Sequence, residues 1–161
     1  MKVILNNIRS CHNVGSIFRT ADACGVSEIF LVGYSPLPID KYKNPNKAML
    51  KVSLGSEKAV KWKKIYGVGK LIKDLKAEGY LIVALELTPT AKNYFDLKLS
   101  SSEFEKAVLI VGNEKRGISK QVLSLADEVI QIPMDGIKES LNVSVAFGIV
   151  SFALRDSSLK S

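Results

Sequence analysis

The chain has 161 residues, 47% hydrophobic and 24% charged, with 11 glycines, 5 prolines and a net charge of +7, a composition that excludes a disordered or collagen-like chain and predicts one globular domain. Two cysteines and a single histidine are too few for a disulfide scaffold or a zinc site, so we expect no metal. The chain has no signal-peptide pattern and no stretch near the roughly 20 apolar residues of a membrane span, so we expect a cytoplasmic protein without membrane contact.

Short aliphatic or β-branched runs predict five strands, at Val3–Leu5, Glu28–Val32, Tyr80–Leu85, Ala107–Val111 and Glu128–Ile132. Helical patterns lie between most of them. Strands that alternate with helices predict an α/β fold with a mostly parallel sheet and helices on both faces. In such sheets ligands bind beyond the carboxyl ends of the strands. This places the candidate site in the segments 6–13, 33–40, 86–90, 112–118 and 133–140.

Four helices are expected. The first carries an apolar stripe from Val14 to Cys24, with Asn13 as its N-terminal cap and Gly25 at its C-terminus. The second covers the stripe that starts at Val68 and ends at Gly79. A third is predicted from about Ser119 to Ala126, and a fourth from about Leu141 to Leu154.

The segment 41–64 carries most of the excess positive charge. It holds eight lysines and one acidic residue, Glu57, so that its own net charge is +7, and it also contains Tyr42 and Trp62. Lysines neutralise phosphates and aromatic rings stack on bases, which favours nucleic-acid binding. A solvated lysine-rich surface is the plain alternative. If nucleic acid binds here, the candidate contacts are Lys58, Lys61, Lys63 and Lys64.

Three segments carry the candidate catalytic and ligand-binding residues. In residues 6–26, Arg19 lies opposite the apolar stripe of its helix, so it either meets solvent or a polar partner. In residues 107–119, Gly112 ends a buried strand and would let a ligand approach the backbone. This is not a dinucleotide-binding fingerprint, because the glycine spacing is absent and Glu114 would repel a pyrophosphate.

The third segment, residues 129–154, ends in a helix that is apolar on nearly every side. Pro133 ends the preceding strand and Ser140 is placed to cap the helix. A helix that is apolar all round is buried all round, either within the chain or against a partner subunit. Asn142 is costly in such a helix unless its amide is hydrogen-bonded.

With these segments together, the chain resembles the SpoU (TrmH-like) family of RNA 2′-O-ribose methyltransferases, within the SPOUT superfamily. Asn13, Arg19 and Thr20–Asp22 are similar to the first motif of that family, and Gly112, Glu114 and Gly117 to the second. The third motif, which is the most specific, is matched by Ile132–Met134 and Ser140–Ala146. The resemblance spans nearly the whole chain, and we expect a single methyltransferase domain without the N-terminal RNA-binding extension that many members carry.

The resemblance implies a fold, a cofactor and a partner. The expected fold is a five- or six-stranded α/β domain whose C-terminal segment forms a deep trefoil knot. The implied cofactor is S-adenosylmethionine, bound in the knot, and the implied assembly is a homodimer with the helix 141–154 in its interface and the site completed across it. The cofactor contacts carried over from the family are Leu87, Gly112, Ile132, Met134, Ser140 and Leu141.

The resemblance also implies roles in catalysis. A ribose 2′-hydroxyl must lose its proton as it attacks the methyl group. Arg19 corresponds to the catalytic arginine of the family, and because a guanidinium stays protonated we expect it to stabilise the developing alkoxide rather than to act as a base. Asn13 and Asn142 would position the ribose and Arg19, Glu114 would orient Arg19 or the substrate, and Ser140 would hold the loop of the site.

His12 is the only histidine and lies outside the family motifs, so no role is assigned to it. Three alternatives to a ribose methyltransferase are open: a non-catalytic RNA-binding module of the same fold, an α/β enzyme acting on a small nucleotide, and an RNA base methyltransferase. The run from Ser140 to Val143 favours ribose as the acceptor. Transfer RNA and ribosomal RNA are both compatible substrates.

Overall fold

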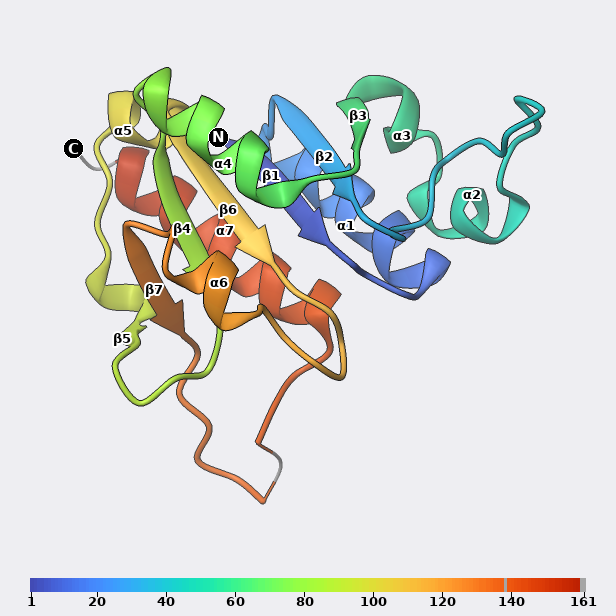
Figure 1. Ribbon diagram of the computed structural model, residues 1–161. Coiled ribbons are helices and arrows are strands. Elements are labelled where there is room, and N and C mark those ends of the chain that lie inside the picture. Colours follow the sequence, from blue (N-terminus) through green and yellow to red (C-terminus); the bar gives the residue numbers. More distant parts are fainter. Residues whose placement is uncertain (138, 160–161) are drawn as a thin grey trace.

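The structure is a computed structural model that describes residues 1–137 and 139–159. In this part of the chain, seven strands form one parallel sheet in the order β3-β2-β1-β6-β4-β7-β5 (Figure 1). The strands are β1 (Lys2–Asn6), β2 (Glu28–Val32), β3 (Lys61–Ile65), β4 (Leu81–Leu85), β5 (Lys92–Asn93), β6 (Ala107–Val111) and β7 (Glu128–Gln131). The predicted α/β class is therefore confirmed. The trefoil knot implied by the resemblance does not follow from the strand order and stays a prediction.

Helices cover both faces of the sheet (Figure 1). They are α1 (Cys11–Cys24), α2 (Lys47–Ser53), α3 (Ser56–Ala59), α4 (Val68–Ala77), α5 (Ser101–Glu105), α6 (Lys120–Leu123) and α7 (Val143–Leu159), with a 3-10 turn at Tyr94–Asp96. Alternate residues of the central strands point to opposite faces. Val3 and Leu5 of β1 pack in the core beneath α1 and α7, whereas Ile4 packs in the core beneath α4 and α6.

The five predicted strands are confirmed, with ends that differ by at most one residue. Sequence analysis missed β3 and β5. β3 has the sequence KWKKI, and its lysines hide the strand because a strand at the edge of a sheet needs only one apolar face. β5 has only two residues, too few for a periodic pattern.

The N-terminal cap of α1 is Ser10, and the expectation that Asn13 caps this helix is wrong. The Ser10 side chain accepts a hydrogen bond from the Asn13 backbone N–H, at 3.2 Å. The cap therefore lies three residues earlier, which leaves the Asn13 side chain free for another partner. Gly25 closes the helix as predicted, with the left-handed φ of 75° that favours glycine there.

α7 begins at Val143 and ends at Leu159, so the predicted range 141–154 is displaced at both ends. Asn142 lies before the first turn, and its side-chain Oδ1 accepts a hydrogen bond from the Ser144 N–H at 2.8 Å. Asn142, rather than Ser140, thus occupies the capping position. Phe147, Val150 and Leu154 are fully buried against the sheet and α1.

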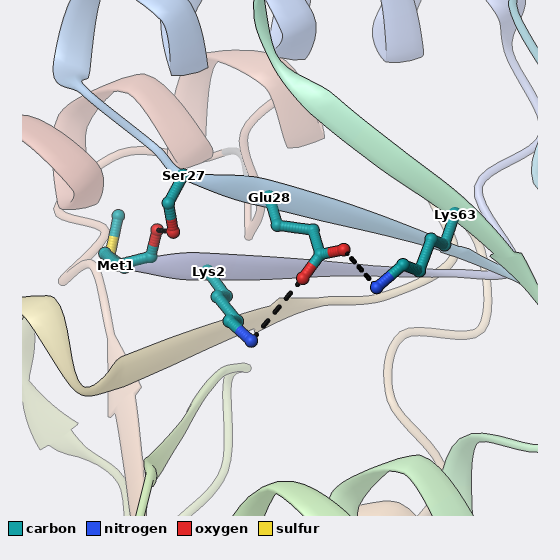
Figure 2. A network of polar contacts seen from close by, with 5 residues as sticks. All are labelled: Met1, Lys2, Ser27, Glu28 and Lys63. Carbon is teal, nitrogen blue, oxygen red and sulfur yellow. Dashed lines mark hydrogen bonds and ion pairs between the residues drawn. The ribbon is translucent and has the colours of Figure 1, made fainter.

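The amino ends of β1 and β2 and the middle of β3 are joined by a small ionic network (Figure 2). Glu28 is only 8% exposed, and its carboxylate forms ion pairs with the ammonium groups of Lys2, at 3.4 Å, and of Lys63, at 2.8 Å. The carbonyl of Met1 also accepts a hydrogen bond from the Ser27 hydroxyl at 3.0 Å. A buried carboxylate needs such partners. The Lys63–Glu28 ion pair also links the edge strand β3 to its neighbour β2.

Candidate functional site

A cavity of about 330 Å³ lies beyond the carboxyl ends of β4, β6 and β7. This is where ligands bind in parallel α/β sheets, and the volume is in the range of small-molecule sites. The cavity is lined by residues of three loops and of the first turn of α7. The six cofactor contacts that the family resemblance implies, Leu87, Gly112, Ile132, Met134, Ser140 and Leu141, all line it. The structure therefore brings them together, and their role toward a cofactor stays a prediction.

The loop after β6 turns back on itself at Gly112 and Gly117. Asn113 and Gly117 exchange two backbone hydrogen bonds, at 2.8 and 3.3 Å. A Cβ atom at Gly112 would lie 2.6 Å from the carbonyl carbon of Gly117, a separation that real side chains do not reach. Sequence analysis attributed Gly112 to the close approach of a ligand; here its first requirement is the close approach of the chain itself.

Glu86 is a cavity residue that sequence analysis missed. Its carboxylate accepts hydrogen bonds from the backbone N–H groups of Ile118, at 2.6 Å, and of Leu87, at 3.1 Å. A side chain at Gly117 would collide with the same carboxylate. Glu86 therefore fixes the loop after β6 to the end of β4. An acidic residue directly after the apolar run of β4 was the signal that could have revealed it.

Glu114, Asn13 and Asn142 form a continuous chain of hydrogen bonds beside the cavity. The Asn13 amide donates to Glu114 Oε1 at 2.9 Å, and the Asn142 amide donates to Asn13 Oδ1 at 3.1 Å. Glu114 also lines the cavity. Residues of all three sequence motifs thus meet at one place, although 129 positions separate Asn13 from Asn142.

The Glu114 carboxylate sits at the N-terminus of α1. It accepts the backbone N–H groups of Arg9, at 2.9 Å, and of Ser10, at 3.1 Å. Partial burial alone would raise the pKa of the Glu114 carboxyl, but the hydrogen bonds from Arg9, Asn13 and Ser10 outweigh it and hold that pKa below its ordinary value. The positive end of the helix dipole favours the same ionised state.

Arg19 does not join this chain within one subunit. Its side chain is exposed and makes no hydrogen bond or ion pair with residues 1–137 and 139–159. The prediction that it faces away from the core is confirmed. The expectation that Glu114 orients Arg19 is not met in the single subunit, because the carboxylate is taken by Arg9, Ser10 and Asn13. His12 is exposed two helical turns before Arg19, on the same face of α1.

Asn113 is a second residue that sequence analysis missed. Its side chain is 7% exposed, and its amide donates to the Asn7 carbonyl and to the Tyr34 hydroxyl, both at 2.9 Å. Its Oδ1 accepts the backbone N–H groups of Lys115, at 3.0 Å, and of Arg116, at 2.8 Å. One buried amide thus arranges the turn that bounds the cavity. An asparagine between two motif residues gave no periodic signal.

The four lysines predicted to contact nucleic acid differ in their surroundings. Lys58 and Lys61 are exposed and have no ion-pair partner among the described residues. Lys63 is paired with Glu28. The Lys64 ammonium donates to the carbonyls of Gly33 and Ser35, and burial lowers its pKa. Of these four lysines, only Lys58 and Lys61 can therefore bind a phosphate without breaking a contact within the protein.

Residues 1–137 and 139–159 contain no cluster of three or more histidine, cysteine or acidic side chains arranged to hold a metal ion. None of their helices combines the length and the apolar character that crossing a membrane requires.

The sequence model of the SpoU rRNA Methylase family matches residues 1–152. The chain is 34% identical over 152 residues to the tRNA (guanosine(18)-2′-O)-methyltransferase of Aquifex aeolicus (strain VF5), covering 93% of this chain and 66% of that enzyme. It thus spans just under two thirds of the length of that curated relative.

Two solved structures have the same fold. The crystal structure of the A. aeolicus TrmH/SpoU tRNA modifying enzyme superimposes with a TM-score of 0.83 at 31% identity, covering 98% of this chain and 75% of that one. The AdoMet-bound rRNA methyltransferase of Sinorhizobium meliloti superimposes with a TM-score of 0.84 at 29% identity, covering 96% of this chain and 55% of that one.

Proposed function

The chain belongs to the SpoU rRNA methylase family, as its motifs predict, and we propose that it transfers a methyl group from S-adenosylmethionine to a ribose 2′-hydroxyl of tRNA or rRNA. The observation that carries this proposal is the hydrogen-bonded chain from Glu114 through Asn13 to Asn142, at the rim of a cavity lined by the implied cofactor contacts. The A. aeolicus relative is named as a tRNA 2′-O-methyltransferase, and the S. meliloti structure contains AdoMet.

The residues around the cavity suit this cofactor. Leu87, Ile132 and Leu141 offer apolar surface for a flat base, and the loop at Gly112 leaves backbone accessible. When bound, S-adenosylmethionine supplies an activated methyl group. Glu114, one end of the hydrogen-bonded chain, lines the cavity, so a ribose held by that chain would lie next to the methyl group.

In this proposal the chain's own polar groups orient the acceptor. Asn13 and Asn142 hold each other in place, and Glu114 holds Asn13. Fixed amides and a fixed carboxylate can align a ribose hydroxyl for in-line attack without reorganising during the reaction. Arg19 would stabilise the alkoxide that forms as the hydroxyl loses its proton. Ser140, at the cavity wall, would hold the loop before α7.

We propose a homodimer in which the partner subunit's Arg19 completes the site. Two observations support it. Arg19 is exposed on α1 and is not among the residues that line the cavity of its own subunit. Val145, Ile149 and Phe152 form a stripe along α7 and are 49%, 36% and 38% exposed, an apolar face that a second copy would cover. With RNA as the substrate, the proposed location is the cytoplasm.

The proposed activity is tested with isotope-labelled S-adenosylmethionine and separate pools of tRNA and rRNA. Labelled RNA is digested to nucleosides, and 2′-O-methylated ribonucleosides are the expected product. Label on a base instead would identify a base methyltransferase. RNA binding with no label in either pool would identify a non-catalytic module, and sedimentation of the protein alone tests the dimer.

A further inference from the structure

Aromatic and basic side chains follow the carboxyl ends of four neighbouring strands. Tyr66 comes after β3, Tyr34 after β2, Arg9 after β1, and Lys115 with Arg116 after β6. The strand register brings these ends to one edge of the sheet. With about 4.8 Å between strands, the row covers roughly 14 Å. We call these five residues the strand-end row.

Tyr34 is fixed at both ends and yet largely exposed. Its backbone N–H donates to Asn7 Oδ1 at 3.3 Å, and its hydroxyl accepts from the Asn113 amide at 2.9 Å. The side chain is nevertheless 57% exposed. A ring that is held in one orientation while part of it meets solvent loses little entropy when a flat group stacks on it.

The row continues directly into the cavity. Lys115 and Arg116 line it, and Asn113, which holds the Tyr34 hydroxyl, lines it too. The same Asn113 accepts the backbone N–H groups of both basic residues. One amide therefore links the position of the Tyr34 ring to the wall of the cavity beside Glu114.

The charges of the row are available to a ligand. Arg9, Lys115 and Arg116 are exposed and take part in none of the ion pairs among the described residues. Tyr66 is 87% exposed, and the Lys64 ammonium lies 5.8 Å from its ring centre. Two exposed rings followed by unpaired cations are suited to single-stranded nucleic acid, whose bases stack while its phosphates meet the charges.

Resting on the proposed function, we propose that the strand-end row binds the unpaired nucleotides next to the ribose that is methylated. Tyr34 stacks on the neighbouring base, Tyr66 stacks on a base farther along, and Arg9, Lys115 and Arg116 meet the phosphates. A ribose in a regular helix is flanked by paired bases that cannot stack on protein rings. The row therefore selects a loop or an unpaired end as the RNA substrate.

The proposal is tested by binding of a short fluorescent single-stranded RNA of mixed sequence, followed by anisotropy without methyl donor. Stacking contributes about 1–3 kcal/mol per base, so Tyr34→Ala and Tyr66→Ala should each weaken binding roughly 5- to 150-fold. Tyr34→Phe keeps the ring and should bind more tightly than Tyr34→Ala. The control is Phe95→Ala, because Phe95 is a 47% exposed ring that follows β5, at the opposite edge of the sheet from β3; its binding should stay within about twofold. Tyr42→Ala, a 71% exposed ring in the basic segment 41–64, tests that segment as the rival stacking surface.

Duplex RNA of the same sequence should bind more weakly than the single strand and should respond little to Tyr34→Ala. The row is refuted if Tyr34→Ala and Tyr66→Ala bind like the wild type, or if Tyr42→Ala has the larger effect. Tyr66 is held by no hydrogen bond among the described residues, so its variant keeps the test decisive if Tyr34→Ala misfolds. Binding that depends on the row without methyl transfer to any RNA would refute the proposed function alone.

Discussion

The side-chain amide of Asn142, directly before α7, donates a 3.1 Å hydrogen bond to Oδ1 of Asn13 in the first turn of α1. Asn13 in turn donates to Glu114 at 2.9 Å. The first two residues are the ends of a chain segment that spans most of the protein, and the third lies between them in sequence. Asn13 comes after β1 and Glu114 comes after β6. The Asn13–Glu114 bond therefore depends on the strand order, which places β1 beside β6.

Removal of either amide should slow methyl transfer without loss of the cofactor. We expect Asn13→Ala and Asn142→Ala each to lower the single-turnover rate roughly tenfold or more, because each leaves its partner without a fixed position. The double variant should be little slower than the worse single variant, since residues in contact are not additive. Equal and additive effects would show that the two amides act independently.

Arg19→Ala should abolish methyl transfer and leave the affinity for S-adenosylmethionine, measured by calorimetry, within a few-fold. The reason is that Arg19 is not among the residues that line the cavity with the implied cofactor contacts. Arg19→Lys should recover little activity, because a lysine lacks the planar guanidinium. A lost cofactor site with residual turnover would contradict this assignment.

Mixing of two inactive variants tests whether Arg19 acts across subunits. Subunits with Arg19→Ala and subunits with Asn142→Ala should together regain roughly a quarter of the wild-type activity, because a mixed dimer contains one site with both residues intact. No recovery in a verified mixed dimer would place Arg19 and Asn142 in the same subunit's site.

Ile149→Glu should convert the proposed dimer to a monomer, because it puts a charge in the middle of the exposed apolar stripe on α7. Analytical ultracentrifugation measures the outcome. Leu54→Glu is the matched control, since Leu54 is 66% exposed and lies outside α7. An unchanged sedimentation coefficient for Ile149→Glu would move the interface to another face.

Gly112→Ala should destabilise the protein by about 1–3 kcal/mol and weaken cofactor binding, because the new methyl group would meet the backbone of Gly117. Gly136→Ala is the control, since no atom lies within 4 Å of a Cβ built there. Chemical denaturation gives the free energy of unfolding of both variants. Equal free energies of unfolding for the two variants would show that the loop after β6 moves aside to accommodate the methyl group.

Glu114 should make stability dependent on acid pH. Its pKa is lower in the folded protein than the ordinary value of 4.5, so its stabilising contribution is present above that value and is lost as the pH falls through the folded-state pKa. Glu114→Gln should therefore be less stable than the wild type at neutral pH, with a difference that shrinks toward strongly acid pH. A constant difference would show that its effect is not ionic.

The sequence by itself predicted the central strands and the longest helices, and it named many of the residues that the structure brings together at the cavity. The runs at β1, β2 and β6 are buried on both faces, so their apolar continuity reveals them. The motif residues Asn13, Glu114 and Asn142, and the cavity contacts such as Gly112, were recognisable from the family resemblance.

Only the tertiary structure decided how these residues meet. It showed that Asn142 precedes α7, that Glu114 binds the start of α1 rather than Arg19, and that Lys63 is committed to Glu28. Glu86 and Asn113 entered the site in the same way, because each bonds to backbone N–H groups that belong to a loop. Periodicity reports which side of a segment is buried, whereas a hydrogen bond between distant residues depends on strand order and loop path.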